Sequence, residues 1–142
     1  MSITSLIEGQ TETVVSCSPG DSVQHAATLL AEKRIGALPV MEGANVVGVF
    51  SERDLLYCVA KEGAAVLDRK VGEVMTSPAI TIPPGEKVLA ALSMMTRRRI
   101  RHLPVVDGET MVGFVSIGDL VKYRMDRIEE EAQAMREYIT TA

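Results

Sequence analysis

The chain contains two copies of one sequence unit. Residues 14–56 and 79–121 align without a gap at an offset of 65, and 15 of the 43 aligned positions are identical. The identities form clusters: Pro19-Gly20 with Pro84-Gly85, Leu38-Pro39-Val40 with Leu103-Pro104-Val105, Gly43 with Gly108, Gly48 with Gly113, Ser51 with Ser116, and Asp54 with Asp119. Such a repeat predicts two halves that fold against each other about a pseudo-twofold axis, with paired clefts between them.

The size of the repeat bears on how the chain is divided. A length of 142 residues allows one compact domain or two very small ones. A unit of about 60 residues buries too little surface to be robust alone. The sequence therefore predicts two halves that share one core, and a hydrophobic content of 46% is sufficient for it.

Charge and cysteine content restrict the partners and the compartment. A net charge of −4 argues against general binding to nucleic acid or anionic membranes. Cys17 and Cys58 lack disulfide-type spacing, which favours a reducing environment. Residues 1–15 do not resemble a secretion signal, and no run approaches the roughly 18 apolar residues that span a bilayer. We expect a soluble, cytoplasmic protein.

Each repeat has the same predicted order of elements, β-α-β-β-α, which gives an α/β (α+β) fold. A short β-branched run at 13–16 or 79–82 precedes a Pro-Gly turn. Apolar residues at helical spacing then predict a helix that Asp21 or Glu86 opens. Strands at 37–41 and 46–50, and at 103–106 and 111–115, form hairpins, and second helices begin at Glu52 and Ile117. A short helix at 68–75 is expected in the linker.

The C-terminal helix carries a regular apolar stripe. Its members are spaced 4-3-4-3-4 and are Val121, Met125, Ile128, Ala132, Met135 and Ile139. This spacing fits an a/d stripe over nearly three heptads, with charged residues beside it. Two interpretations remain open: an amphipathic helix that lies on its own domain, and the seam of a dimer.

Two Ser-x-x-Asp segments, Ser51–Asp54 and Ser116–Asp119, each follow a strand and open a helix. The pattern is close to a capping box, in which hydroxyl and carboxylate satisfy the first amides of the helix. The same geometry offers N–H donors to an anion, and a carboxylate one turn along can accept both hydroxyls of a ribose. The two roles are compatible.

The segment Arg97–His102 is the densest charge in the chain. Arg97 and Arg98 suit a helix C-terminus, where cations oppose the helix dipole, and Arg99 is undecided. Arg101 and His102 fall at the start of a strand, where the first copy has Gly36-Ala37. This difference favours one cationic cleft that binds phosphate over a nucleic-acid patch, since no aromatic residues interleave.

Catalytic patterns are absent from the sequence. With only two histidines, a catalytic triad or a His-rich metal site is hard to build, and neither GxxxxGK[ST] nor GxGxxG occurs. We therefore expect neither an enzyme nor a metal protein.

Over residues 10–123, the repeated Ile-x-x-Leu-Pro-Val and Gly-x-x-x-Ser-x-x-Asp patterns resemble a pair of cystathionine-β-synthase (CBS) domains, together called a Bateman module. Three segments are typical of small stand-alone bacterial CBS-pair proteins: Val74–Thr76, Arg99–Asp107 and Val115–Val121. The resemblance implies a non-catalytic regulatory protein that binds an adenine nucleotide (AMP, ADP, ATP or an NAD-type ligand) in clefts between the repeats. It also implies a homodimer through the CBS helices, which agrees with the C-terminal stripe, and an unknown regulated partner.

The resemblance also implies which residues line each cleft. A stronger cleft would combine Ser51, Arg53, Asp54, Ile80, Thr81, Ile82, Arg101 and His102. In this cleft, Asp54 would bind the ribose, and backbone groups near Thr81 would recognise adenine. Arg101 and His102 would bind phosphate. A second cleft would combine Val15, Ser16, Cys17, Gly36, Ala37, Ser116 and Asp119. It would bind a nucleotide more weakly, or a ligand with less phosphate, unless Arg34 reaches into it.

Four segments follow from this interpretation: repeat 1 with the N-terminal segment (1–62), a linker (63–78), repeat 2 (79–123) and a C-terminal amphipathic helix (124–142). The alternatives are a ligand-independent scaffold whose Ser-x-x-Asp segments are only caps, and a small enzyme. Because an unperturbed histidine loses its charge near pH 6–7, nucleotide affinity is expected to fall as the pH rises through that range, and also with salt.

Overall fold

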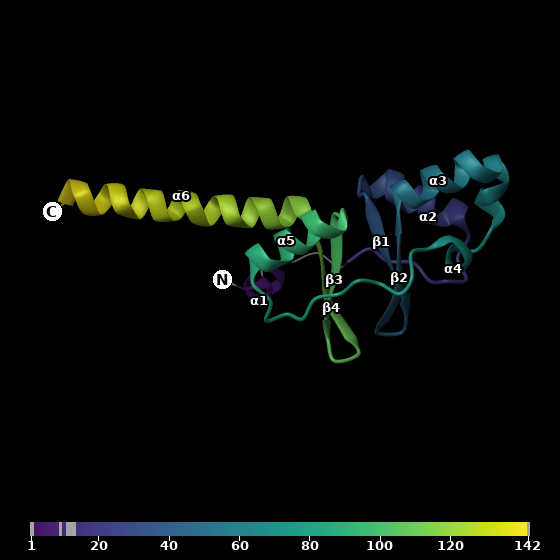
Figure 1. Ribbon diagram of the computed structural model, residues 1–142, viewed down its shortest axis with the longest axis horizontal. Coiled ribbons are helices and arrows are strands. Elements are labelled where there is room, and N and C mark those ends of the chain that lie inside the picture. The colour runs from purple at the N-terminus through teal and green to yellow at the C-terminus, as the bar shows by residue number, and fades with distance from the viewer. Residues whose placement is uncertain (1, 9, 11–13, 142) are drawn as a thin grey trace.

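The computed structural model describes residues 2–8, 10 and 14–141, and the two repeats form two similar halves side by side (Figure 1). The first half contains α2 (Val23–Lys33), β1 (Ala37–Glu42), β2 (Asn45–Ser51) and α3 (Glu52–Glu62). The second half contains α5 (Val88–Arg98), β3 (His102–Asp107), β4 (Thr110–Ser116) and α6 (Ile117–Thr141). Between them lie the 3-10 helix η1 (Gly63–Asp68) and α4 (Val71–Val74), and α1 (Ile3–Glu8) begins the chain.

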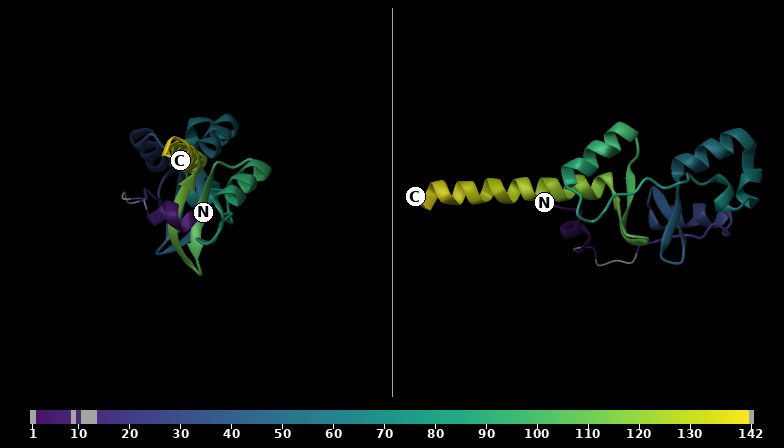
Figure 2. Two further views of the ribbon diagram at one scale, coloured as in Figure 1. Left: turned by 90° about the vertical axis from the view of Figure 1, so that its left-hand side faces the viewer. Right: turned by 60° about the horizontal axis from the view of Figure 1, so that its bottom comes forward.

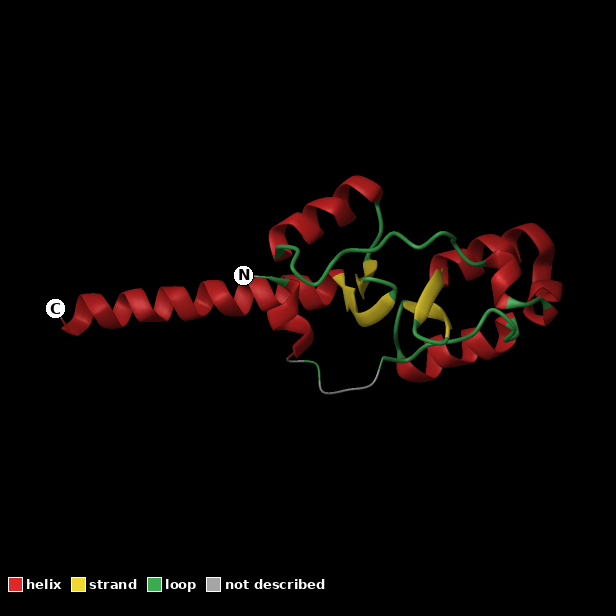
Figure 3. Ribbon diagram, turned by 90° about the horizontal axis from the view of Figure 1, so that it is seen from below, coloured by secondary structure: helices red, strands yellow, loops and turns green. Residues whose placement is uncertain are grey.

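The two predicted hairpins are confirmed, and they have equivalent registers. Ala37 pairs with Ser51 in the first, and His102 pairs with Ser116 in the second. Gly43 and Gly108 occupy the turns with φ of 61° and 64°, a region that glycine adopts without strain, which explains their identity between repeats. Figure 3 shows the two small sheets in the middle of the molecule, with helices on the outside.

The predicted first strand of each repeat is not a strand. Residues 14–16 and 79–81 have no regular secondary structure, and next to them Cys17 and Ile82 make single parallel bridges, to Val40 and Val105. Residue 13 lies outside the described residues. Two or three residues with one bridge cannot build a ladder, so the β-branched runs serve as short edge segments.

The prediction of one shared core is wrong. The buried side chains form two clusters, one in each half. Phe50 and Leu38 lie in the first cluster, and Leu103 and Met95 lie in the second. Each half therefore has its own core. Because one repeat alone buries too little surface to be robust, each core needs an additional chain segment from outside its repeat.

That additional segment is the helical segment before each repeat, which packs on the other repeat. Ile3 and Leu6 of α1 are buried in the second core, although the sequence groups them with the first repeat. In the same way, Val71 of α4, which precedes the second repeat, is buried in the first core. The two halves are therefore interlocked, because the N-terminal helix before the first repeat completes the second core and the linker helix before the second repeat completes the first.

Two repeat glycines allow this exchange. A Cβ atom at Gly48 would lie 2.6 Å from Sδ of Met75, and one at Gly113 would lie 2.7 Å from Cγ2 of Ile7. Both distances are shorter than real Cβ contacts. Glycine is required at these positions because the exchanged segment crosses directly over the strand.

The C-terminal helix projects from the second half. Figures 1 and 2 show α6 leaving the body along the long axis of the molecule, away from the first half. Of its described residues, Leu120 alone is buried, and every residue from 125 to 141 is exposed. The interpretation that this helix lies on its own domain is therefore wrong for all but its first turns.

Candidate functional site

A cleft with a volume of about 100 Å³ lies where the two halves meet. The first half contributes the start of β1 and the β2–α3 junction, and the second half contributes the segment before β3 and the linker end. Its lining residues are Gly36, Ala37, Val49, Ser51, Arg53, Asp54, Thr76, Ala79, Ile80, Arg99, Ile100, Arg101 and His102. The cleft thus combines a carboxylate from one half with cations from both.

Asp54 is the most highly connected side chain of this cleft. Its Oδ2 accepts hydrogen bonds from the Ser51 amide at 2.9 Å and the Ser51 hydroxyl at 3.0 Å. Its Oδ1 accepts a hydrogen bond from the Thr76 hydroxyl at 3.0 Å. The Thr76 contact shows that Oδ1 faces the cleft, where a carboxylate oxygen can accept a further hydroxyl.

The capping role of both Ser-x-x-Asp segments is confirmed. Ser51 and Asp54 form a complete capping box on α3. Asp119 Oδ2 accepts from the Ser116 amide at 2.9 Å, and Ser116 Oγ accepts from the Asp119 amide at 3.0 Å. Capping engages Oδ2 in both copies, so it leaves the second carboxylate oxygen for other partners.

The arginines of the cleft hold partners that a stronger anion can replace. Arg101 Nη2 lies 3.2 Å from Glu52 Oε1, and both side chains are more than half exposed. Arg53 Nη1 donates to the Arg99 carbonyl at 3.1 Å, which links the two halves. Exposed pairs of this kind contribute about 0–1 kcal/mol, so a phosphate would compete for both guanidinium groups at little cost.

Arg99 itself has a structural role that the sequence left undecided. Arg34 and Arg99 both end their helices in the left-handed conformation, with φ of 53° and 55°. Arg97 and Arg98 lie in the last turn of α5, as predicted. The basic cluster therefore divides into helix-terminal residues and the pair Arg101-His102, which leads into β3.

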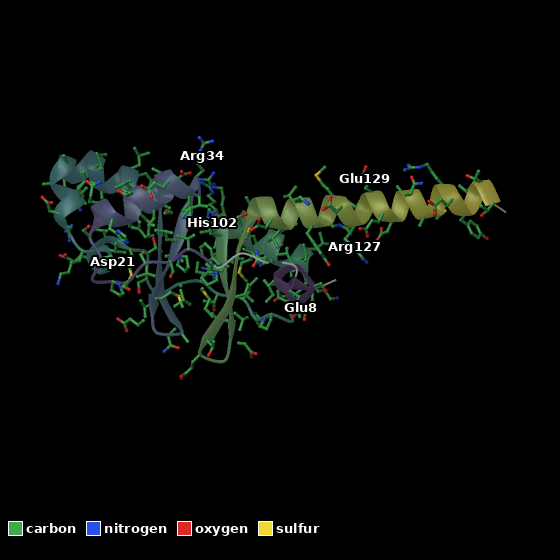
Figure 4. All side chains as sticks on the ribbon, turned by 180° about the vertical axis from the view of Figure 1, so that it is seen from behind. Glu8, Asp21, Arg34, His102, Arg127 and Glu129 are labelled. Atoms are coloured by element: carbon green, nitrogen blue, oxygen red, sulfur yellow. The ribbon has the colours of Figure 1, made fainter. Side chains whose placement is uncertain are left out.

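His102 lies at the junction of the halves (Figure 4). A Cβ at Gly36 would lie 3.1 Å from its Cε1 atom, so glycine makes room for the imidazole. The ring stacks on Phe114 with centroids 5.8 Å apart. Burial, and next the charge of Arg101, lower the pKa of His102 below its ordinary value of 6.5, although Asp119 and Glu52 oppose this shift.

This lowered pKa changes the expected pH dependence. The unfolded chain takes up the His102 proton near pH 6.5, before the folded protein does, so the free energy of unfolding should decrease as the pH falls below 6.5. His102→Gln should reduce this slope in urea unfolding curves. An unchanged slope in His102→Gln would contradict the assignment. The pH window for phosphate affinity likewise moves below the 6–7 range that the sequence suggested.

A second, more open cleft of about 510 Å³ adjoins the first. Arg34, Glu52 and Ser116 line it, and it shares Gly36, Arg101 and His102 with the first cleft. Arg34 therefore does reach this cleft. The repeat-equivalent positions 36–37 and 101–102 meet at the junction instead of facing separate sites, so Arg101 and His102 contribute to both clefts.

Other predicted site residues fall outside the linings of both clefts. Ile82 is 1% exposed and belongs to the second core, and Thr81 is exposed beside it. Val15 packs on the first core, Ser16 is exposed and Cys17 is buried. Asp119 is absent from both linings and acts on His102 only through its charge.

Sequence reasoning missed Val49, Thr76, Ala79 and Ile100, which line the first cleft. Thr76 forms an antiparallel bridge with Val49 of β2, which brings its hydroxyl to Asp54. No repeat position marks Thr76, because its equivalent, residue 11, lies before the aligned region. The one sequence feature that could have pointed to Thr76 is its position in the Val-Met-Thr segment before the second repeat.

Three further observations concern other kinds of chemistry. Among the described residues, no group of three or more His, Cys, Asp or Glu side chains is placed to hold a metal ion. Burial, with a smaller contribution from Asp21, raises the pKa of the Cys17 thiol to about 11, so this cysteine is a protonated core residue. In the described part of the chain, no helix has the length and apolar character needed to cross a membrane.

Comparison with known proteins agrees with this architecture. The family model described as CBS domain matches residues 9–61 and 71–126. CBS domain-containing protein CBSX3, mitochondrial, of Arabidopsis thaliana is 38% identical over 128 residues, covering 87% of this chain and 62% of that protein. The structure of CBS-domain containing protein ATU1752 from Agrobacterium tumefaciens is 34% identical, with a TM-score of 0.81 over 87% of this chain and 99% of that one.

A more distant structure has the same fold. The CBS domain pair of protein MJ0100, in complex with 5′-methylthioadenosine and S-adenosyl-L-methionine, is 22% identical, with a TM-score of 0.76 over 89% of this chain and 98% of that one. The two family matches coincide with the two repeats, and the structural likeness extends over both. The chain belongs to the CBS-domain family and carries its domains as a tandem pair.

Proposed function

We propose that this protein is a non-catalytic regulatory module that binds an adenine nucleotide in the first cleft. The observation that carries the proposal is the convergence of Asp54 from one half with Arg101 and His102 from the other. A carboxylate suits the ribose of a nucleoside phosphate, and a guanidinium with an imidazole that can donate a hydrogen bond suits the phosphate. Binding between two interlocked halves would bias the angle between them, and a partner protein would read that change.

The contacts within the cleft favour specific roles. Asp54 Oδ1, which already accepts the Thr76 hydroxyl, would accept a ribose hydroxyl. Arg53 and Arg101 would exchange their exposed partners for phosphate oxygens. The apolar side chains of Ile80 and Ile100 would lie against the base. The protein MJ0100 binds adenosine compounds without phosphate in this fold, and the arginines here favour a phosphate-bearing ligand such as AMP, ADP, ATP or NAD.

The volume of the cleft limits the mode of binding. At about 100 Å³ it is smaller than the roughly 300–1,000 Å³ of typical ligand pockets. The phosphates would therefore lie at the rim, toward Arg101 and the adjoining open cleft. The second cleft, with Arg34 and Ser116, would bind a nucleotide more weakly, because Asp119 does not line it.

We also propose a homodimer. Four large apolar side chains on α3 and α5 are exposed without a partner among the described residues: Leu56, Tyr57, Val59 and Leu89, between 40% and 65% exposed. Together with the projecting α6, they leave more apolar surface than isolated residues on a monomer usually do. A second copy that covers these helix faces would explain them.

A ligand-independent scaffold is the alternative, and one observation favours it: both Ser-x-x-Asp segments act as helix caps. Melting curves with AMP, ADP, ATP, NAD and S-adenosylmethionine separate the two functions. A ligand at 100 times its dissociation constant stabilises the folded state by about 2.7 kcal/mol, so at least one should raise the melting temperature by several degrees. No increase with any of them would favour the scaffold.

A further inference from the structure

The exposed part of α6 has no packing partner among the described residues. Residues 125–141 are all exposed, whereas helices in proteins gain most of their stability by packing an amphipathic face against another element. Along it, Met125, Ile128 and Met135 are 62%, 48% and 59% exposed. These side chains lie on one stripe, so one partner helix could cover them all.

The stripe has a defined heptad register. Val121, Ile128 and Met135 occupy d positions. Met125, Ala132 and Ile139 occupy a positions. This register gives six apolar layers, and it assigns the flanking charges to e and g positions, which set the orientation of the partner in a coiled coil.

The charges beside the stripe are complementary to those of a second α6 helix that runs parallel to the first. In a parallel pair, each g residue faces the e residue five positions later on the other helix. Arg124 at g would face Glu129 at e, and Glu131 at g would face Arg136 at e. Symmetry makes each of these attractive pairs twice. Within the described residues, Arg124, Glu129 and Glu131 have no hydrogen-bond or ion-pair partner of their own.

An antiparallel pair fits the same charges poorly. In the antiparallel register that keeps all six layers, Lys122 faces Arg136, and Glu129 and Glu131 each face their own copy. All of these are like-charge pairs. A shift by one heptad in either direction removes the repulsion, but it reduces the seam from six layers to four.

We propose that α6 pairs with α6 of a second copy as a parallel two-stranded coiled coil. The inference rests on the proposed homodimer and specifies its geometry: the two C-termini lie together, far from both nucleotide clefts. The stripe of about three heptads is short, so the helix faces of the body contribute to the same dimer. The outward residues, including Arg127, remain in solvent, where Arg127 lies 3.9 Å from Glu130.

Cysteine cross-linking of the full chain tests the orientation. In a Cys58→Ser background, Met125→Cys should form an interchain disulfide, because a parallel a layer places each residue opposite itself. Arg127→Cys, on the outward face, is the matched control and should not. A mixture of Met125→Cys and Met135→Cys chains that forms mainly the mixed disulfide would overturn the parallel arrangement in favour of the antiparallel one.

Sedimentation of full-length variants tests the charge pairing without a cross-link. Arg124→Glu or Glu129→Arg alone should weaken dimerisation by roughly 5- to 30-fold, and the double exchange should restore it. Ala132→Ile should strengthen the dimer, whereas Ala134→Ile, on the outward face, should not. A double variant as weak as the single ones would refute the parallel pairing alone. A wild-type chain that stays monomeric at every concentration would refute the homodimer itself.

Discussion

Alanine at Gly113 is expected to lower the free energy of unfolding by about 1–3 kcal/mol, the usual cost of forcing an extra carbon into a packed site. The new methyl group would lie 2.7 Å from Cγ2 of Ile7. Ile7 is β-branched and sits in α1, which the Ile3 amide ties to the Glu86 carbonyl at 2.8 Å, so it cannot easily withdraw. Urea unfolding monitored by circular dichroism measures the change.

The chain provides matched controls for this experiment. Gly85→Ala and Gly20→Ala change glycines at which a Cβ meets nothing within 4 Å, and neither has a positive φ. Both should leave stability unchanged or slightly raised. Gly48→Ala should behave like Gly113→Ala, because the new Cβ would also lie 2.9 Å from the Thr76 carbonyl oxygen. Equal stability of Gly113→Ala and Gly85→Ala would show that α1 does not pack over β4.

Asp54→Ala is expected to weaken nucleotide binding by roughly 10- to 150-fold, which corresponds to a lost hydrogen bond to a charged group of about 1.5–3 kcal/mol. Asp119→Ala should have a smaller effect, because Asp119 lines neither cleft. The comparison is well matched. Both substitutions remove a capping carboxylate from the same position of the repeat, which should cost each variant about 0.5–2 kcal/mol of stability, and Asp54→Ala also removes the bond to Thr76.

Isothermal titration of the two variants, at a temperature where circular dichroism shows both to be folded, measures this difference. Thr76→Val is a further test, because it removes the hydroxyl that positions Asp54 Oδ1 and should also weaken nucleotide binding. A larger loss for Asp119→Ala than for Asp54→Ala would place the stronger site elsewhere.

The local structure of each repeat could be predicted from the sequence. Glycine at the hairpin turns, serine before the helices and alternating apolar residues are signals that act over a few residues. Helix starts were placed two residues early, because Asp21 and Glu86 belong to the turns that precede α2 and α5. The two hairpins have equivalent registers, which is what the repeat implies.

The exchange of segments between halves could not be predicted in this way. Ile3 and Leu6 carry the same apolar signal whichever core they enter, and the choice depends on contacts more than 75 residues away in the sequence. The meeting of Gly36 with His102 has the same origin. Aligned repeats show which positions are equivalent, but they do not show that equivalent positions face each other across the axis.

Interlocking bears on how a bound ligand would act. Thr76, which contacts Asp54, belongs to the exchanged segment that also closes the first core over Gly48. A ligand that pulls on Asp54 and Arg101 together would therefore act on both halves and on the segment that joins them. No separate relay is required, since Thr76 bonds Asp54 directly and Arg101 of the second half contacts Glu52 of the first.

The most direct test of nucleotide binding between the halves is a titration of the full chain with an adenine nucleotide, followed by backbone amide chemical shifts. We predict the largest shifts at Ser51, Thr76, Ile80 and Ile100, from both halves at once, with smaller shifts near Ser116. Unchanged spectra at saturating AMP, ADP, ATP and NAD, or shifts confined to one half, would contradict the proposed site.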